Sequence, residues 1–335
     1  MIICLIMKKK QIILLAITII FLVLVFNKVD FATLLQTIKN FDLRYLASII
    51  GIFLLSLYAR GIRWKFLLMN DKKYSSLNLA EIFTVGNMLN IFMPARAGDI
   101  YRAYYLGEEK NEKKLKIFGT IILERLFDGI AMFCILLGAI LLYSDARWIL
   151  NLTLGIGGVF VIGTLTFYLI FRYNKSRQVC KAIISHIKYE KIQRLIRKLT
   201  TYMNIFIKGF SAFNRPAYML LILGMSFVAW GLEGVVACLI VNSFGLNLGI
   251  LAGLFVLTLT SFSTMIPSTS VLVGPYQAAY ILALGLFGIE KSQALAISAV
   301  HQIILILIFT LVGGVCMLKF NIKAQNSRLQ EDFRP

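Results

Sequence analysis

Long apolar stretches separated by short polar segments dominate the pattern of residues along this chain. A helix needs about 20 mostly apolar residues to cross the hydrocarbon core of a membrane. Stretches that approach this length occupy residues 11–26, 45–58, 117–143, 148–171, 216–242 and 294–318. The pattern therefore predicts an all-α polytopic membrane protein with about six full spans.

Two further apolar segments are each interrupted by a proline, which lacks the amide hydrogen that a continuing helix needs. They cover about residues 79–106 and about residues 248–287. The interruptions are Pro94 and Gly98 in the first segment, and Pro267 and Gly274 in the second. We expect both segments to be re-entrant helical hairpins. The alternative is that the prolines only kink ordinary spans.

Polar side chains gather around both interruptions, which a structural kink does not require. They are Asn87, Asn90, Arg96, Asp99 and Arg102 in the first segment, and Ser268, Thr269, Tyr276 and Gln277 in the second. Irregular backbone cannot face lipid, because unpaired N–H and C=O groups are too unfavourable there. The half-helix ends should therefore point into a shared polar interior, where exposed N–H groups attract anions. We expect these residues to bind the headgroup of a substrate.

The spans and hairpins divide the chain into two transmembrane halves. We expect the first half at residues 1–171, a basic cytoplasmic linker at 172–215, the second half at 216–320 and a cytoplasmic tail at 321–335. Lys and Arg gather in loops that lie on one side if the first hairpin returns to the cytoplasm. Both termini are then cytoplasmic, and the second hairpin enters from the opposite face. Transporters built from inverted repeats have this arrangement.

The composition supports a membrane protein and excludes a soluble one. The 335 residues are 59% hydrophobic and 15% charged, whereas soluble domains carry about 25% charge. The net charge is +19, with the basic residues in short loops beside apolar spans. There they act as topology signals and contact anionic headgroups, so we expect membrane lipids as partners and no nucleic acid. The linker mixes basic and apolar residues, which predicts an amphipathic helix on the anionic leaflet of the cytoplasmic membrane.

Charged residues inside the apolar spans form a second group of candidates. Glu124 and Asp128 are four positions apart and share a helix face, and Arg125 can reach Asp128. Because an intramembrane charge is costly unless it is paired, we interpret these residues as a buried charge network with Arg96 or Arg102. The alternative places them at the interface, in the first turns of a span.

Two further polar residues lie in the second half. Glu233 lies deep in its span and is a candidate buried acid. His301, near the start of the last span, is interpreted either as a hydrogen-bonded structural residue or as a proton carrier.

In the first half, a basic segment with an aromatic anchor precedes the first hairpin and predicts headgroup contact. Its residues are Arg60, Arg63, Trp64 and Lys65.

The sequence contains no recognisable catalytic motif of the GxSxG, HExxH, P-loop or GxGxxG type. Its five cysteines form no CxxC pair and are interpreted as small apolar residues. We therefore expect no catalytic residue, no metal and no cofactor. Gly313 and Gly314 in the last span would allow close packing against another helix, including one from a second copy.

Several motifs together resemble the transmembrane region of lysylphosphatidylglycerol synthase. They are RGIRWKFLL, NIFMPARAGDIYRAYYLG, ERLFDG and PSTSVLVGPYQAA, followed by His301 in the last span. Their order and spacing extend over nearly the whole chain. The resemblance implies a bundle with two re-entrant hairpins and a central lipid-binding cavity. It also implies translocation of a phospholipid or a lipid-linked sugar between leaflets.

The chain departs from the pattern of this family in two ways. The soluble aminoacyl-transferase domain of the full synthase is absent, so we expect no synthesis of lysyl-lipid. Gln277 stands where a glutamate is common in relatives, which argues against a mechanism that needs an acid at this position.

We therefore expect a lipid flippase or transporter that moves an anionic phospholipid or a lipid-linked sugar. In this hypothesis Arg96 and Arg102 bind the phosphate, while Asp99, Glu124 and Asp128 hold the arginines in place. Two alternatives stay open. The chain is a membrane partner subunit of a cell-envelope glycosyltransferase or synthase, or it is an embedded transferase that acts on polyprenyl phosphate.

Overall fold

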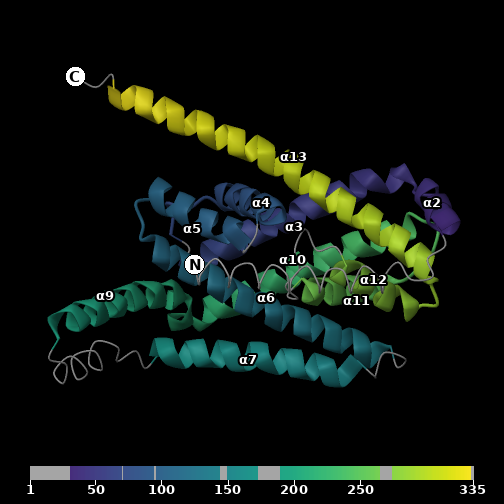
Figure 1. Ribbon diagram of the computed structural model, residues 1–335, viewed down its shortest axis with the longest axis horizontal. Coiled ribbons are helices and arrows are strands. Elements are labelled where there is room, and N and C mark those ends of the chain that lie inside the picture. Colours follow the sequence, from purple (N-terminus) through teal and green to yellow (C-terminus); the bar gives the residue numbers. More distant parts are fainter. Residues whose placement is uncertain are drawn as a thin grey trace, which may run out of the picture. The chain divides into compact units, whose positions relative to one another are not determined.

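The computed structural model describes residues 31–69, 71–93, 96–143, 149–172, 189–264 and 274–332. Within these ranges the chain is helical and forms no β-strand (Figure 1). Five helical stretches are long and apolar enough to cross a membrane, namely Leu43–Leu67, Lys114–Leu142, Thr153–Arg172, Pro216–Asn242 and Lys291–Phe320. They confirm the prediction of an all-α, multi-pass protein. The first predicted span, together with Pro94, Pro267, Ser268 and Thr269, lies outside the described residues.

The described part of the first half contains a short helix and a 3-10 turn, followed by a long helix, two shorter helices and two long helices. The elements are α2 (Phe31–Lys39), η1 (Leu43–Tyr45), α3 (Leu46–Leu67), α4 (Ser76–Phe92), α5 (Ala97–Glu109), α6 (Lys114–Leu142) and α7 (Leu150–Arg172). Helix α3 continues past residue 58, where its apolar run ends in the sequence. The helix continues because the basic segment after residue 58 is also helical, and its arginines are buried in ion pairs with acids of another helix.

The second half follows the same order after a helix of the linker. Its elements are α9 (Glu190–Ile207), η4 (Lys208–Asn214), α10 (Pro216–Asn242), α11 (Ile250–Ser263), α12 (Pro275–Gly285) and α13 (Lys291–Asp332). In each half a long helix is followed by two short helices that pack against each other and then by another long helix (Figure 1). This order is the one that an inverted repeat requires. The insertion of the short pairs into a membrane as re-entrant hairpins stays a prediction.

The chain divides into two compact units. Unit 1 comprises Met1–Ser56, Met132–Leu154 and Ala229–Leu311. Unit 2 comprises Leu57–Ala131, Gly155–Val228 and Val312–Pro335. The α11–α12 pair therefore belongs to unit 1, and the α4–α5 pair belongs to unit 2.

The α4–α5 pair is held together by a close backbone approach and a side-chain cap. A Cβ atom added at Gly98 would lie 1.8 Å from the carbonyl oxygen of Gly86, so only hydrogen fits between these helices. The side-chain oxygen of Asn90 on α4 accepts a hydrogen bond from the amide of Gly98 on α5, at 2.8 Å. This bond satisfies one of the amide groups that every helix start leaves without an intrahelical partner.

Candidate functional site

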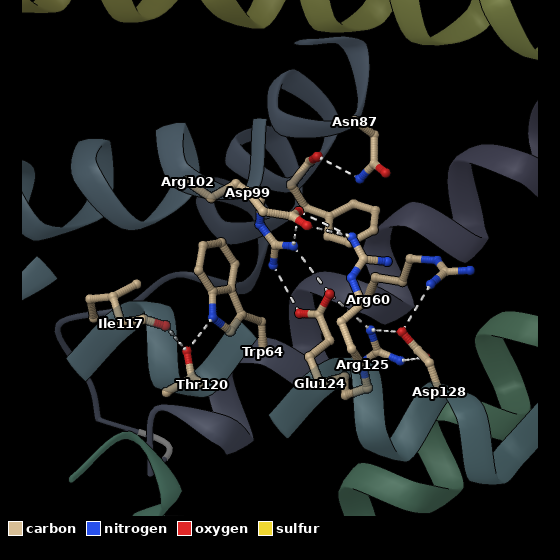
Figure 2. Close-up of polar contacts among 12 residues, drawn as sticks. Arg60, Trp64, Asn87, Asp99, Arg102, Ile117, Thr120, Glu124, Arg125 and Asp128 are labelled. Atoms are coloured by element: carbon tan, nitrogen blue, oxygen red, sulfur yellow. Dashed lines mark hydrogen bonds and ion pairs between the residues drawn. The ribbon is translucent and has the colours of Figure 1, made fainter. Parts of the chain in front are cut away.

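An array of positive and negative side chains lies inside unit 2, on helices α3, α5 and α6 (Figure 2). We call it the charge cluster, and its members are Arg60, Arg63, Asp99, Arg102, Glu124, Arg125 and Asp128. The Glu124 and Asp128 side chains are only 0% and 6% exposed. Both acids are therefore buried among helices and do not lie at an exposed interface.

Arg102 is enclosed on all sides. Its Nη1 and Nη2 atoms donate hydrogen bonds to Oε1 and Oε2 of Glu124, at 3.1 and 2.8 Å. Its guanidinium also lies over the rings of Trp64 and Phe83, with Cζ 4.2 and 4.7 Å from the ring centroids. The Trp64 indole is fixed in turn by donating from Nε1 to Oγ1 of Thr120, at 3.1 Å. Arg102 thus has no surface left for a ligand, which differs from the phosphate-binding role suggested by the sequence.

The basic segment of α3 joins the same cluster. Arg63 pairs with Asp128 and donates a hydrogen bond from Nη1 to Oγ of Ser226, at 2.9 Å. Its Nη2 atom also lies 3.4 Å from Oε1 of Glu124. Nη1 of Arg60 lies 3.9 Å from Oδ2 of Asp128. The headgroup contact expected for Arg60, Arg63 and Trp64 is thus replaced by buried pairing, while Lys65 is half-buried.

Arg125 forms the accessible end of the cluster. Its Nη2 atom donates to both carboxylate oxygens of Asp99, at 3.0 and 3.2 Å, yet its side chain remains 30% exposed. The other three arginine side chains of the cluster are 4% exposed or less. A ligand that approaches the charge cluster therefore meets Arg125 first.

Arg96 lies beside this accessible end. It is exposed and immediately precedes α5, with a left-handed backbone conformation at φ 53°. Its charge interacts with those of Arg125 and Asp99. Among the described residues it forms no ion pair within 4.0 Å, so its guanidinium is available to a ligand.

Positive side chains meet at the accessible end of the charge cluster. Arg125 remains 30% exposed there, and Arg96 adds an exposed guanidinium beside it. Two like charges in a low-dielectric setting are unfavourable unless an opposite charge lies between them. The arrangement is therefore suited to receive an anion between Arg96 and Arg125.

Asn87 and Asn90 lie on α4, next to the charge cluster, and form hydrogen bonds within the protein. Nδ2 of Asn87 donates to the carbonyl of Phe83 within α4, at 2.9 Å (Figure 2). Asn90 caps α5 and also donates from Nδ2 to Asp99, at 3.3 Å. Asn90 thus orients the carboxylate that holds Arg125.

Unit 1 contains a second polar group, around the start of α12. Gly274 has a φ of 99°, and its amide donates to Oε1 of Gln277, at 2.7 Å. Nε2 of Gln277 donates to Oε1 of Gln302, also at 2.7 Å. His301 is buried, and its Nδ1 atom lies 3.2 Å from the hydroxyl of Tyr280. Gln277 therefore shapes the start of the helix with the oxygen that a glutamate would also supply.

Two other predicted residues of unit 1 are also buried or partly buried. The hydroxyl of Tyr276 is enclosed without a hydrogen-bond partner in the part of the chain that the structure describes. Glu233 is partly buried and accepts a hydrogen bond from Oγ of Ser56, at 3.3 Å.

Four residues that contact the predicted site residues are not among the candidates from the sequence, because little in the sequence distinguishes them. They are Phe83, Thr120, Ser226 and Tyr280. Tyr280 could have been found, because it lies one helical turn after Tyr276. The others are ordinary residues of apolar helices, and their roles depend on partners far away in the sequence.

Comparison with known protein families supports the family resemblance that the sequence motifs indicate. The profile described as the lysylphosphatidylglycerol synthase TM region matches residues 11–313. The chain belongs to this family. One relative by sequence is a UPF0104 membrane protein of Methanocaldococcus jannaschii, which is 30% identical over 68% of this chain and 92% of the relative. Another is a UPF0104 membrane protein of Pyrococcus horikoshii, 23% identical over 93% of this chain and 97% of that protein.

A third relative has a functional name. The glycosyltransferase AglD of Haloferax volcanii is 23% identical over 92% of this chain, and the match covers 54% of that enzyme. No solved structure matches the chain. Membership of the lysylphosphatidylglycerol synthase TM family therefore rests on the family profile and on the membrane-protein relatives.

Proposed function

We propose that this member of the lysylphosphatidylglycerol synthase TM family moves a lipid with a phosphate-bearing headgroup between the leaflets of the cytoplasmic membrane. The observation that carries the proposal is the pair of accessible arginines at one end of the charge cluster, the partly exposed Arg125 and the exposed Arg96. An anionic headgroup would bind between these two guanidinium groups.

Guanidinium groups suit such a headgroup because their planar donors match the oxygens of phosphate in a bidentate manner. Arg125 is already oriented by Asp99 and therefore loses little side-chain freedom on binding. Arg96 would provide the second, more mobile contact. Arg102 and Arg63 would hold the geometry of the cluster and would not touch the lipid.

The arrangement of helices supports movement across the bilayer and not only binding. Short helices broken by proline survive in lipid only where they are packed in protein or line a polar cavity. One such pair occurs in each half, as in transporters with inverted repeats. The loops rich in Lys and Arg support cytoplasmic termini, because such loops favour the cytoplasmic side under the positive-inside rule. The proposal assigns no catalytic chemistry and no cofactor to the chain.

Reconstitution into vesicles tests the proposal directly. Purified protein should increase the rate at which a fluorescent phosphatidylglycerol becomes accessible to a quencher on the other side of the vesicle. Arg96→Gln and Arg125→Gln should reduce this rate at least about tenfold, since each removes a charged hydrogen-bond donor to phosphate.

Arg44→Gln is the matched control, because the Arg44 side chain is 90% exposed and pairs only locally with Asp42. Its rate should equal that of the wild type. Equal rates for all three variants, with intact folding, would refute the role of Arg96 and Arg125. No lipid movement by the wild-type protein with any anionic lipid tested would refute transport.

A second function is favoured by one relative. Because the match to AglD covers 54% of an enzyme named as a glycosyltransferase, the chain is alternatively a membrane partner of a glycosyltransferase that builds the cell envelope. Co-purification of a soluble glycosyltransferase with the tagged chain, and loss of that enzyme's product after deletion of the chain, would favour this function. Product formation by the purified chain alone would instead identify an embedded transferase.

A further inference from the structure

Helix α9 exposes a continuous apolar stripe. Its members are Ile192, Leu195, Leu199, Tyr202 and Met203, whose exposed fractions lie between 45% and 56%. Their spacing of three to four residues places them on one face of the helix. An exposed stripe of this length marks a contact surface, because leaving it in water forfeits the gain from burying apolar area.

Two lysines flank this stripe. By helical spacing, Lys191 and Lys198 lie beside it, while Arg194 and Arg197 lie toward the opposite face. All four side chains are exposed, and Glu190 is the one acid of the helix. Arg194 pairs with Glu190 at 2.5 Å, which leaves the positive charges in clear excess. The exposed half of α9 therefore offers apolar and cationic groups side by side.

The C-terminal end of α9 is anchored in the core of unit 2. Ile207 is buried there, as are Phe210 and Phe213 of η4. The ring of Phe210 packs against Phe167 of α7 and Phe206 of α9, with centroids 5.1 and 5.2 Å apart. One end of α9 is thus fixed against α7, a helix that is long and apolar enough to cross a membrane.

We propose that α9 docks on the surface of an anionic bilayer, with the apolar stripe in the boundary between headgroups and acyl chains. The Lys191 and Lys198 side chains would then contact anionic phospholipids. A lipid surface fits better than a protein groove, because α9 lies between the spanning helices α7 and α10 in the sequence and combines apolar area with net positive charge. This docking does not depend on whether the chain transports lipid.

The test uses full-length protein in nanodiscs and a polarity-sensitive fluorophore on a single cysteine. In a background without native cysteines, the fluorophore is attached at Leu199→Cys on the stripe or at Thr201→Cys, which is exposed on the polar side. The Leu199 label should shift to shorter wavelength in nanodiscs that contain phosphatidylglycerol and shift less in pure phosphatidylcholine. High salt should reverse part of the shift, and the Thr201 label should stay in water throughout.

Charge variants then separate lipid attraction from general insertion. Lys191→Gln with Lys198→Gln should lower the docking equilibrium about 25-fold, since each basic residue near an anionic surface contributes about fivefold. Lys72→Gln with Lys113→Gln removes the same charge from other exposed positions and should leave the shift unchanged.

Three results would overturn the proposal. One is a Leu199 label that remains in water in every nanodisc, and another is an equal response of both charge variants. The third is a shift that depends on protein concentration in detergent and not on lipid charge, which would assign the stripe to a second copy of the chain.

Discussion

Arg102 and Glu124 form a doubly hydrogen-bonded ion pair in which neither side chain is exposed. Two charges enclosed in this way lose most of their hydration, and their mutual attraction compensates only while both partners are present. The pair therefore constrains α5 and α6 to one relative position within unit 2. This constraint keeps Arg125 of α6 next to Asp99 of α5, where the accessible end of the cluster lies.

Removal of one partner of this pair should be strongly destabilising. We expect Glu124→Ala to lower the free energy of unfolding by about 3–5 kcal/mol, because it leaves the Arg102 guanidinium buried and without its carboxylate. Thermal unfolding in detergent, followed by size-exclusion chromatography, measures the loss. The double variant Arg102→Met with Glu124→Leu should recover most of it, since it removes both charges of the buried pair together.

Asp42→Ala is the control for this experiment. It also removes an acid from an arginine–carboxylate pair, but the Arg44 partner is 90% exposed. The expected loss is therefore much smaller than that of Glu124→Ala, and it comes from the cap that Asp42 provides to the Arg44 amide. If Glu124→Ala were as stable as Asp42→Ala, the burial of the charge cluster described above would be wrong.

The spanning helices could be predicted from the sequence, but the partners within the charge cluster could not. Helices α7 and α10 are almost continuously apolar, so their hydropathy alone reveals them. The sequence predicts that Arg63 belongs to a basic segment at the membrane surface. This prediction differs from the structure because hydropathy does not distinguish a solvated arginine from one paired with a distant acid. Its partner Asp128 lies 65 positions away in the chain, and nothing local indicates that pairing.

The polar residues at the first hairpin show the same limit. The sequence pattern indicates Asn90, Asp99 and Arg102 as functional candidates, because they are polar residues within an apolar segment. The same pattern does not distinguish Asn90, which caps α5, from a residue that faces a ligand. That distinction depends on the close approach of α4 and α5, which is set by Gly86 and Gly98.

The contact between α4 and α5 provides a second prediction. We expect Gly98→Ala to destabilise the protein by about 1–3 kcal/mol or more, because the new methyl group would overlap the backbone of Gly86 and cannot be relieved by a side-chain rotation. The change should appear as a lower melting temperature in detergent. Gly158→Ala in α7 is the matched control, since a Cβ there meets no atom within 4 Å. Equal melting temperatures for the two variants would contradict the close packing of α4 and α5.

Glu112, in the loop between α5 and α6, gives a prediction about pH. Partial burial raises the pKa of Glu112, but hydrogen bonds from Lys73 and Lys116 outweigh this effect, so the pKa lies below its usual 4.5. A lowered pKa contributes stability above pH 4.5 that is lost as the pH falls through the lowered value. Wild type should therefore melt about 2 °C above Glu112→Gln near neutral pH, and the difference should vanish in acid.

The control for this pH dependence is Asp71→Asn. Asp71 is half exposed, and its nearest carboxylate oxygen is 3.9 Å from Nζ of Lys73. Its melting temperature should follow that of the wild type at every pH. A difference between wild type and Glu112→Gln that persists unchanged into acid would show that the ion pair is not its cause.

Binding of an anionic lipid should be visible as stabilisation even without a transport assay. A ligand that binds only the folded state raises its stability by RT ln(1 + [L]/Kd), which is about 2.7 kcal/mol at a hundredfold excess over Kd. We expect short-chain phosphatidylglycerol to raise the melting temperature of the wild type more than phosphatidylcholine does. Arg96→Gln should remove most of this difference while leaving the melting temperature without lipid unchanged, because Arg96 is exposed and outside the ion pairs of the cluster. Arg44→Gln should keep the full response, and an Arg96→Gln protein that kept it too would place the anion elsewhere.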